Sequence, residues 1–560
     1  MIEETTCAAA AAKAPAGGKL EVRRGPEATP DPALSLGNAI LHWLREHQTR
    51  TALIDAHLGT SMSFHELLVL TTYAAEGYKA MGLVPGDVVA VVSRNYHQQV
   101  AAMLGAVCAG LRVAYVDPSG DLAEMRHSLE LVRPKAVVSE RDRLRTAMDA
   151  YPDARHVVLS GEPPEQAVET FLGVLRLGEG AEPRPDPCTY RAVDVAGPGR
   201  QASLILYSSG STGLPKAVLV PDNLGVFYSS GETESTEAGS GRYLACIPPT
   251  GISPWRALLW GLKGGAARVF TTLSDSPTIL SAIERFKVRG MGTVPSVVRE
   301  LLIYKEKCKH RYDLSSLEVL HIFGSACDAE LHAALERHLH CRVLQKYGCT
   351  ETSRVFMWSA SKPSPPGALG TLGAGVELRL VDVDTGEDVP AAVKHAVGEV
   401  RVRSKTVMLG YLGNPAETAR AFDEHGFYKT GDLVYEDADG HYFFVERSVE
   451  MLTYKGTKVS PSEVEAVLLQ HPGVREACVL GRRVGEGVSC DDLPAAFVSR
   501  ADGAAGEDVT EGALRAAVAE RLSDAHRLRG GVYFLDSLPR AGMSRKVARS
   551  KLKEMLRNLD

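Results

Sequence analysis

Near the middle of the chain the sequence reads Leu204-Ile205-Leu206-Tyr207-Ser208-Ser209-Gly210-Ser211-Thr212-Gly213-Leu214-Pro215-Lys216. The aliphatic start predicts a buried strand, and the hydroxyl residues and glycines that follow predict a loop. Glycine lets the backbone approach a phosphate closely, and consecutive N–H groups with Ser and Thr hydroxyls can cradle an anion. Because Lys216 adds a positive charge, we expect this loop to bind phosphate.

The loop differs from the Walker motif, in which Gly-Lys is followed by Ser or Thr. Here Pro215 precedes Lys216, and Ala217 follows it. The stretch resembles the phosphate loop of the adenylate-forming (AMP-binding) superfamily, which includes acyl- and aryl-CoA ligases such as 4-coumarate–CoA ligase, beetle luciferases and peptide-synthetase adenylation domains. The resemblance implies ATP, Mg²⁺ and coenzyme A as cofactors. It places these residues at the phosphates: Ser208, Ser209, Gly210, Ser211, Thr212, Gly213 and Lys216.

Composition is that of a globular protein with several domains. The chain has 560 residues, of which 44% are hydrophobic and 24% charged. The formal net charge is −6 and there is no basic block, so we expect no nucleic-acid partner. The ten cysteines include no Cys-x-x-Cys pair, and the spacing of His332, His338, His340 and Cys341 matches no zinc template.

The N-terminal residues 1–35 are expected to form a disordered tail. They are not expected to be a secretory signal, because the Ala-rich start carries Glu3 and Glu4 where such a signal needs positive charge. The apolar segment Val100–Val116 contains Arg112 and is too short to span a bilayer. The chain ends without a peroxisomal tripeptide. We therefore predict a cytoplasmic monomer or homodimer without a transmembrane segment.

Strand and helix patterns alternate in the first third of the chain, which predicts a parallel sheet with helices on its faces. The clearest are strands Val88–Val92, Val113–Val116 and Ala136–Val138 and helices Phe64–Ala80 and Gln98–Ala109. Residues 160–200 are rich in Gly, Pro and Glu and are expected to be a surface excursion.

The resemblance implies an α/β fold in two parts. The large N-terminal domain, residues 36–445, is expected to contain stacked α/β sheets plus a β-barrel-like subdomain. Residues 446–560 are expected to form a small, mobile α+β lid domain that rotates between two half-reactions.

The segment Ala245–Trp255 resembles the part of the family that lines the acyl pocket. Many members have an aromatic–His pair where this chain has Thr250-Gly251, which opens the site and removes a possible acid/base group. No Asp lies between Tyr243 and Trp260, which argues against an amino-acid substrate.

A second segment of the predicted pocket is Phe323-Gly324-Ser325-Ala326, at the end of a predicted strand. Small residues let a flat base lie against the backbone. The resemblance places Ser325 and Ala326 at the nucleotide. It places the substrate at Gly251, Phe323, Gly324, Ser325 and Tyr347, in a roomy, apolar slot for an aryl or medium to long acyl group.

The run Tyr347-Gly348-Cys349-Thr350-Glu351 resembles the family's Tyr-Gly-x-Thr-Glu motif. The Tyr347 ring can cover a purine, with Gly348 beside it. Thr350 can donate to the α-phosphate, and Glu351 can hold Mg²⁺ through oxygen. The alternative for Glu351 is a solvated carboxylate at a strand end.

Further motifs lie towards the C-terminus. Asp432, in Thr430-Gly431-Asp432, can accept hydrogen bonds from two ribose hydroxyls. The resemblance implies that Arg447 lies at the ribose or phosphate and Lys455-Gly456 beside coenzyme A. It also makes Lys546 the candidate adenylating lysine, for which the alternative is a surface lysine.

The sequence therefore predicts ATP-dependent activation of a carboxylic acid to an acyl-adenylate, followed by thioester formation with coenzyme A. The catalytic candidates are Lys546, Thr350 and Glu351. Two enzymatic alternatives are a luciferase-like oxygenase and an adenylation enzyme that loads a carrier protein. A third alternative is a catalytically weak nucleotide- or acyl-binding relative. It is suggested by departures from the family pattern at Gly251, Glu446, Val449 and Arg545.

Overall fold

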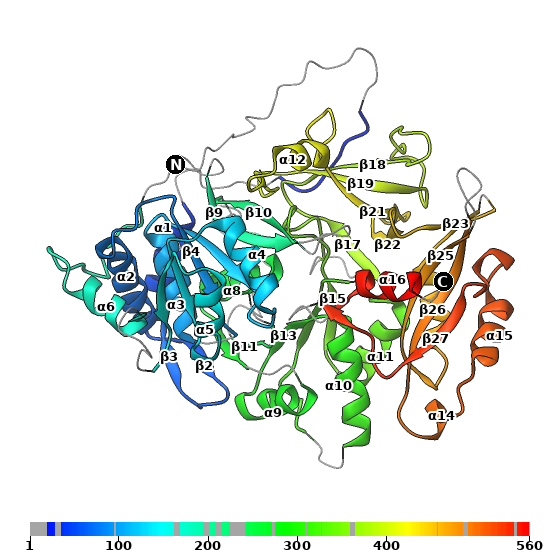
Figure 1. The fold of residues 1–560 in the computed structure, drawn as a ribbon, viewed down its shortest axis with the longest axis horizontal. Coiled ribbons are helices and arrows are strands. Elements are labelled where there is room, and N and C mark those ends of the chain that lie inside the picture. The colour runs from blue at the N-terminus through cyan, green and yellow to red at the C-terminus, as the bar shows by residue number, and fades with distance from the viewer. Residues whose placement is uncertain are drawn as a thin grey trace. The chain divides into compact units, whose positions relative to one another are not determined.

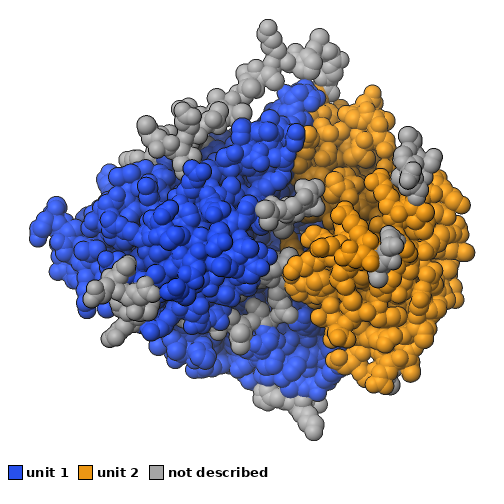
Figure 2. All heavy atoms as spheres, in the orientation of Figure 1, with its two compact units in different colours: residues 1–18, 23–378, 402–428 blue, residues 19–22, 379–401, 429–560 orange. Residues whose placement is uncertain are grey.

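The structure of the chain is a computed structural model (Figure 1). It describes residues 20–27, 35–94, 97–161, 168–193, 201–208, 215–223, 241–247, 249–271, 275–308, 312–325, 327–358, 364–455, 457–484, 491–541 and 546–558. The chain divides into two compact units, the first comprising residues 1–18, 23–378 and 402–428 and the second residues 19–22, 379–401 and 429–560 (Figure 2). The α/β class is confirmed, and the predicted domain boundary at residue 446 stays a prediction.

The first sheet of unit 1 has eight strands. In order across the sheet they are β20 (Gly410–Tyr411), β10 (Lys216–Pro221), β9 (Ala202–Ser208), β5 (Arg112–Val116), β4 (Val88–Val92), β6 (Ala136–Ser139), β7 (Arg155–Val158) and β8 (Val168–Thr170). The run from β9 to β8 is parallel, whereas β10 pairs antiparallel with both β9 and β20. The parallel sheet predicted from the first third of the chain is confirmed.

The second sheet of unit 1 has seven strands. In order they are β15 (Arg342–Gln345), β14 (Val319–Ile322), β13 (Gly290–Thr293), β11 (Arg242–Ala245), β12 (Ala267–Phe270), β2 (Thr51–Asp55) and β3 (Ser61–Ser63). All neighbours are parallel except β2 and β3. The carboxyl ends of β11, β13, β14 and β15 therefore share one edge, where open α/β sheets bind their ligands.

The helices of unit 1 cover these sheets. They are α1 (Leu36–Glu46), α2 (Phe64–Ala80), α3 (His97–Cys108), α4 (Leu122–Val132), α5 (Arg141–Ala150), α6 (Phe171–Glu179), α8 (Ile252–Gly264), α9 (Ser276–Phe286), α10 (Pro295–Lys307), α11 (Ala329–Leu339) and α12 (Pro415–Ala421). No described helix is both long and hydrophobic enough to cross a lipid bilayer.

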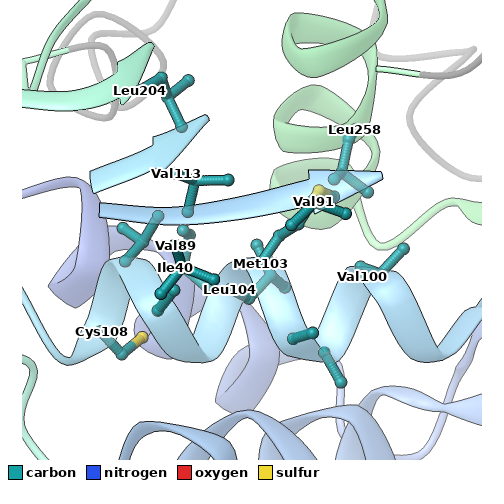
Figure 3. Packing of buried hydrophobic residues seen from close by; sticks show 14 of the residues in the cluster. Ile40, Val89, Val91, Val100, Met103, Leu104, Cys108, Val113, Leu204 and Leu258 are labelled. Atoms are coloured by element: carbon teal, nitrogen blue, oxygen red, sulfur yellow. The ribbon is translucent and has the colours of Figure 1, made fainter. Parts of the chain in front are cut away.

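Strand β4 shows how the core is layered. Its five residues are all buried, and alternate side chains point to opposite faces of the sheet. Val89 and Val91 belong to the cluster that contains α3, which Figure 3 shows with Ile40 of α1 and Leu258 of α8. The other three residues of β4 belong to a second cluster with α4. Helices α3 and α4 therefore cover opposite faces.

The expectation that residues 160–200 form only a surface excursion is wrong. They contain the edge strand β8 and helix α6, whose Phe171 and Val174 are buried. Gly178, one of the glycines that suggested a loop, instead packs against α2, where Gly77 allows the same close approach. A Cβ on Gly178 of α6 would lie 1.8 Å from the Tyr73 carbonyl oxygen of α2, and one on Gly77 of α2 would lie 2.1 Å from the Val174 carbonyl oxygen. Only glycine permits this close approach.

A third sheet corresponds to the expected β-barrel-like subdomain. Its seven strands are β1 (Arg23–Arg24), β16 (Phe356–Met357), β17 (Ala368–Leu372), β18 (Glu377–Val381), β19 (Val397–Arg403), β21 (Tyr428–Glu436) and β22 (Tyr442–Arg447). The division between the two units falls within β18, β19 and β21.

The rest of unit 2 is the predicted α+β domain. Its elements are β23 (Leu452–Tyr454), β24 (Thr457–Val459), α13 (Pro461–Leu469), β25 (Val474–Val484), β26 (Asp491–Arg500), α14 (Ala504–Glu507), α15 (Glu511–Arg521), a 3₁₀ turn (Asp524–His526), β27 (Gly531–Leu535), β28 (Arg540–Ala541), β29 (Lys546–Val547) and α16 (Arg549–Arg557). Strands β25, β26 and β27 form one sheet. Helices α13 and α15 pack with one set of its side chains and α16 with the alternate set.

Candidate active site

The two ends of the predicted phosphate loop lie on neighbouring strands. Strand β9 ends at Ser208, and β10 begins at Lys216, directly opposite it in the antiparallel register. The segment between them therefore connects a β-hairpin. Ser209, Gly210, Ser211, Thr212 and Gly213 lie outside the described residues.

Lys216 is held by a carboxylate and an aromatic ring. Its Nζ donates a hydrogen bond to Glu417 Oε2 of α12 at 2.6 Å and lies 5.0 Å from the centroid of the Tyr411 ring. The pKa of Glu417 is lowered, first by the hydrogen bond from Lys216 and then by that from Arg420. The lysine is thus fixed at the base of the hairpin, with its side chain 28% exposed.

Tyr411 also holds Glu351. Its hydroxyl donates a hydrogen bond to Glu351 Oε1 at 3.0 Å, and the glutamate is only 7% exposed. Burial, followed by the negative charge of Glu351, raises the pKa of Tyr411. The tyrosine is therefore a protonated donor at neutral pH. It contacts both Lys216 and Glu351, two predicted site residues that are far apart in the sequence.

The turn that carries Thr350 depends on Gly348. A Cβ on Gly348 would lie 2.2 Å from the Ser353 carbonyl oxygen, so no other residue fits without moving the backbone. Thr350 is partly buried within this turn. The Tyr347 ring packs 5.2 Å from the Phe356 ring, centroid to centroid.

The predicted acyl segment begins helix α8. Gly251 is its N-cap, and a Cβ there would meet nothing within 4 Å, so the position faces open space. Phe323 follows β14 and is partly buried, whereas Gly324 and Ser325 are exposed. Ala326 lies outside the described residues.

A cavity of about 40 Å³ lies beside Phe323. Its lining surface is mostly apolar, and charged and polar side chains also contribute to it. Its lining residues are Tyr243, Ser253, Arg256, Ala257, Trp260, Gly292, His321, Phe323 and Lys346. Of these, only Phe323 was a predicted substrate residue. His321 and Lys346 lie just before the motifs that begin at Phe323 and Tyr347, but periodicity alone gives them no role.

In unit 2 the structure brings Asp432 and Arg447 together. They are opposite each other on β21 and β22, with Arg447 Nε 3.3 Å from Asp432 Oδ1. Asp432 is 7% exposed and Arg447 is an exposed residue. This places a buried carboxylate beside an accessible cation, which suits recognition of a ribose and a phosphate.

Glu446, one of the departures from the family pattern, has a clear structural role. Its Oε2 accepts hydrogen bonds from Ser460 Oγ at 3.1 Å and from the Ser462 backbone N–H at 2.9 Å, and its side chain is buried. Ser462 lies in the first turn of α13, where N–H groups lack partners within the helix. The carboxylate of Glu446, on strand β22, therefore caps α13.

The predicted coenzyme A and lysine loops are described in part. Lys455 is exposed, has a positive φ of 46°, and donates its backbone N–H to Asp491 Oδ1 at 2.8 Å. Lys546 is partly buried and starts β29, opposite Ala541 of β28. Gly456 and residues 542–545, including Arg545, lie outside the described residues. The roles of both lysines stay predictions.

Comparison with known families agrees with this arrangement. Residues 40–412 match the AMP-binding enzyme family, and residues 463–544 match the AMP-binding enzyme C-terminal domain. The chain belongs to the AMP-binding enzymes. This member is 30% identical over 536 residues to 4-coumarate–CoA ligase 5 of Oryza sativa subsp. japonica, covering 93% of this chain and 95% of that one. It is 28% identical over 528 residues to luciferin 4-monooxygenase of Photinus pyralis, covering 90% and 91%.

Solved structures share the fold of this AMP-binding enzyme. The anthranilate CoA ligase AuaEII, in complex with anthranoyl-AMP, superposes with a TM-score of 0.81 at 23% identity, covering 94% of this chain and 98% of that one. The amide bond synthetase McbA of Marinactinospora thermotolerans gives 0.75 at 24% identity, covering 93% and 99%. Both confirm the fold expected from the motifs.

Proposed function

We propose that this AMP-binding enzyme activates a carboxylic acid with ATP and transfers the acyl group to coenzyme A. The observation that carries the proposal is the contact of Tyr411 with both Lys216 and Glu351. This places a cation at the base of the predicted phosphate loop on the same tyrosine as the predicted metal-binding carboxylate. The 4-coumarate–CoA ligases among its relatives support the same reaction class.

The first half-reaction needs little covalent help from the protein. A carboxylate oxygen attacks the α-phosphorus, an acyl–phosphate bond forms, and the bond to the leaving pyrophosphate breaks. Positioning and neutralisation of charge carry such displacements. Thr350 and Lys546 are the proposed donors to the phosphates, and Asp432 and Arg447 the proposed contacts to the ribose and phosphate.

The second half-reaction exchanges oxygen for sulfur. The thiol of coenzyme A loses its proton and attacks the acyl carbon, a thioester forms, and AMP leaves with the bonding electrons. Lys455 and Gly456 are the proposed neighbours of coenzyme A, and rotation of the C-terminal domain would bring them to the adenylate.

The chemistry of Glu351 fits a magnesium ligand. Mg²⁺ in such sites is usually held by one or two carboxylates together with substrate phosphates. Tyr411 occupies Oε1 of Glu351, and no hydrogen bond from the described residues engages Oε2. When bound, the ion would supply positive charge that offsets the charge of the phosphates. The protein's part is to hold this carboxylate in position.

The test is pyrophosphate release from ATP that depends on an added carboxylic acid, with acyl-CoA detected by mass spectrometry. Glu351→Gln should lower the rate at saturating ATP by about 100-fold. Glu130→Gln changes an exposed glutamate of α4 and should leave the rate unchanged. ATP binding without release of pyrophosphate, across aryl and acyl acids, would favour the non-catalytic alternative.

Dependence on coenzyme A separates the remaining enzymatic candidates. A CoA ligase forms free acyl-CoA. An oxygenase consumes O₂ as it oxidises the adenylate, and a carrier-loading enzyme needs a protein thiol. The predicted cytoplasmic setting and the monomeric or homodimeric state belong to the same proposal.

A further inference from the structure

The cavity beside Phe323 carries positive charge that a slot for a hydrocarbon does not need. Arg256, His321 and Lys346 all line it. Among the described residues, no aspartate or glutamate does. All of the lining residues belong to unit 1, so the cavity is a property of that unit alone.

Besides Arg256 and Lys346, a third cation lies behind the wall. Arg268 of β12 is 4% exposed, and its guanidinium carbon lies 5.4 Å from the centroid of the Tyr243 ring. Its Nη1 donates to the Ala257 carbonyl oxygen at 3.2 Å, and none of the described carboxylates forms an ion pair with it. Burial lowers the pKa of Arg268 to about 10, so the group stays charged at neutral pH.

This uncompensated charge is informative because a buried ion without a counter-ion is costly to fold. Its field favours negative charge in the adjacent cavity, whose walls have low dielectric constant. An anion bound there would supply the missing counter-charge for Arg268 and would lie beside Arg256 and Lys346.

The other walls are flat and aromatic. The Tyr243 ring stacks on His321 at 5.8 Å and meets Trp260 edge-on at 5.6 Å, centroid to centroid. Two glycines of β13 make room for these walls: a Cβ on Gly290 would lie 2.4 Å from Tyr243 Cε2, and one on Gly292 would lie 3.1 Å from Phe323 Cε1. Such surfaces bind the face or edge of an aromatic ring.

The cavity has room for a small polar group. Its volume of about 40 Å³ exceeds the roughly 10–15 Å³ that one water needs, so a carboxylate group can enter it. Phe323 lies two residues before Ser325, a predicted nucleotide residue, and Lys346 directly precedes Tyr347.

We propose that the acid activated by this enzyme is an aromatic diacid, whose second carboxylate binds in this basic cavity while the first one reacts. The inference rests on the proposed acid activation, and it specifies the substrate class. Arg256 and Lys346 are the specificity-determining residues, since they lie on the cavity wall and are only partly buried.

The experiment compares matched acids on the full-length protein by pyrophosphate release. Four diacids are used: 3-carboxycinnamate, 4-carboxycinnamate, terephthalate and homophthalate. Each diacid is compared with the acid that lacks the second carboxylate and with the diacid's own distal methyl ester. For the preferred skeleton, we expect the diacid to exceed both neutral partners in kcat/KM by roughly 10- to 100-fold, the range of a charge-assisted hydrogen bond.

Variants assign the preference to the cavity. Arg256→Met and Lys346→Met should each reduce kcat/KM for the diacid by roughly tenfold or more and change that for the monoacid by less than about threefold. Arg145→Met, which removes an exposed arginine of α5, should change neither. Equal loss for both acids in the cavity variants would overturn the proposal, as would wild-type preference for the monoacids.

Failure of the proposed function gives a different result. If no acid supports pyrophosphate release, acid activation itself fails. Calorimetric binding of the same pairs then still decides the inference, since the cavity should bind the diacid more tightly and lose this preference in Lys346→Met.

Discussion

Tyr411 Oη lies 3.0 Å from Glu351 Oε1, and both side chains are buried. The segments that carry them come together where the Met408 backbone N–H donates to the Glu351 carbonyl oxygen at 2.7 Å. Strand β20 in turn pairs with β10, with Tyr411 opposite Val218, which brings the ring to Lys216. A single hydroxyl thus orients the carboxylate proposed to hold Mg²⁺, while the ring of the same residue packs against Lys216. The positions of the Lys216 and Glu351 side chains both depend on this tyrosine.

Replacing Tyr411 by Phe should weaken the use of Mg²⁺ more than it weakens folding. The ring over Lys216 remains, but Glu351 loses its donor. We expect the Mg²⁺ concentration for half-maximal pyrophosphate release to rise by about 10- to 100-fold, the usual value of one hydrogen bond to a charged group. A magnesium titration measures this. Tyr151→Phe, at a hydroxyl without a hydrogen bond in the described structure, is the control, and an equal shift there would contradict the assignment.

Glu446→Ala should loosen the start of α13. The change removes the acceptor for Ser462 N–H and Ser460 Oγ and should cost about 1–2 kcal/mol of local stability. Hydrogen exchange measured by mass spectrometry should show faster exchange in peptides from α13. Glu554→Ala, at an exposed position of α16, should leave these peptides unchanged. Unaltered exchange in Glu446→Ala would show that the cap contributes little.

Asp222 should make the protein less stable as pH rises. Burial raises the pKa of Asp222 to about 7, while its carboxylate accepts from the Leu36 N–H at 3.4 Å. Between about pH 4 and pH 7 the folded state keeps a proton that the unfolded state has lost, so the free energy of unfolding falls through this window. At about 1.4 kcal/mol per pKa unit, the loss is on the order of 4 kcal/mol at most.

Asp222→Asn removes that titration and retains a side-chain acceptor for Leu36. The variant should therefore unfold at a higher temperature than the wild type at pH 8 and show a smaller gain at pH 5. Thermal unfolding at the two pH values measures the difference. Asp153→Asn, at an exposed site, should follow the wild type at both. A parallel shift of Asp222→Asn at both pH values would mean that its pKa is ordinary.

Gly178→Ala should strongly destabilise unit 1. The added methyl group would lie 1.8 Å from the Tyr73 carbonyl oxygen, and the backbone of α2 would have to move. Overpacking of this kind costs typically about 1–3 kcal/mol, and more where backbone must shift. Urea unfolding should show this loss in the free energy of unfolding. Gly512→Ala, in α15 with the nearest atom at 3.9 Å, should be neutral or stabilising, so similar losses in both variants would exclude the packing explanation.

Local signals made part of the fold predictable. Helix α2 spans Phe64–Ala80 as predicted, because Ser63 and Glu66 form a capping box that fixes its start. Strand β4 also has the predicted bounds, since five consecutive aliphatic residues suit a strand buried on both faces. Helix α6 was missed because the value of its glycine depends on Tyr73, a partner that no local pattern identifies.

The candidate site divides in the same way. Lys216 and Glu351 stand in motifs whose chemistry is visible in the sequence, and so does Asp432. Tyr411 could not be recognised, because its role follows from a strand pairing between distant segments. The basic cavity wall was missed for a related reason: Arg256 and Lys346 come from a helix and a strand end that meet only in the folded sheet.

The interleaving of the two units has a practical consequence. Three of the divisions between them fall inside strands, at β18, β19 and β21. No single break in the gene can therefore yield two independently folding halves, and truncation after residue 428 would leave an unpaired strand edge prone to aggregation. Domain exchange with a homologue would instead have to be designed around breaks in the turns, with the third sheet transferred whole.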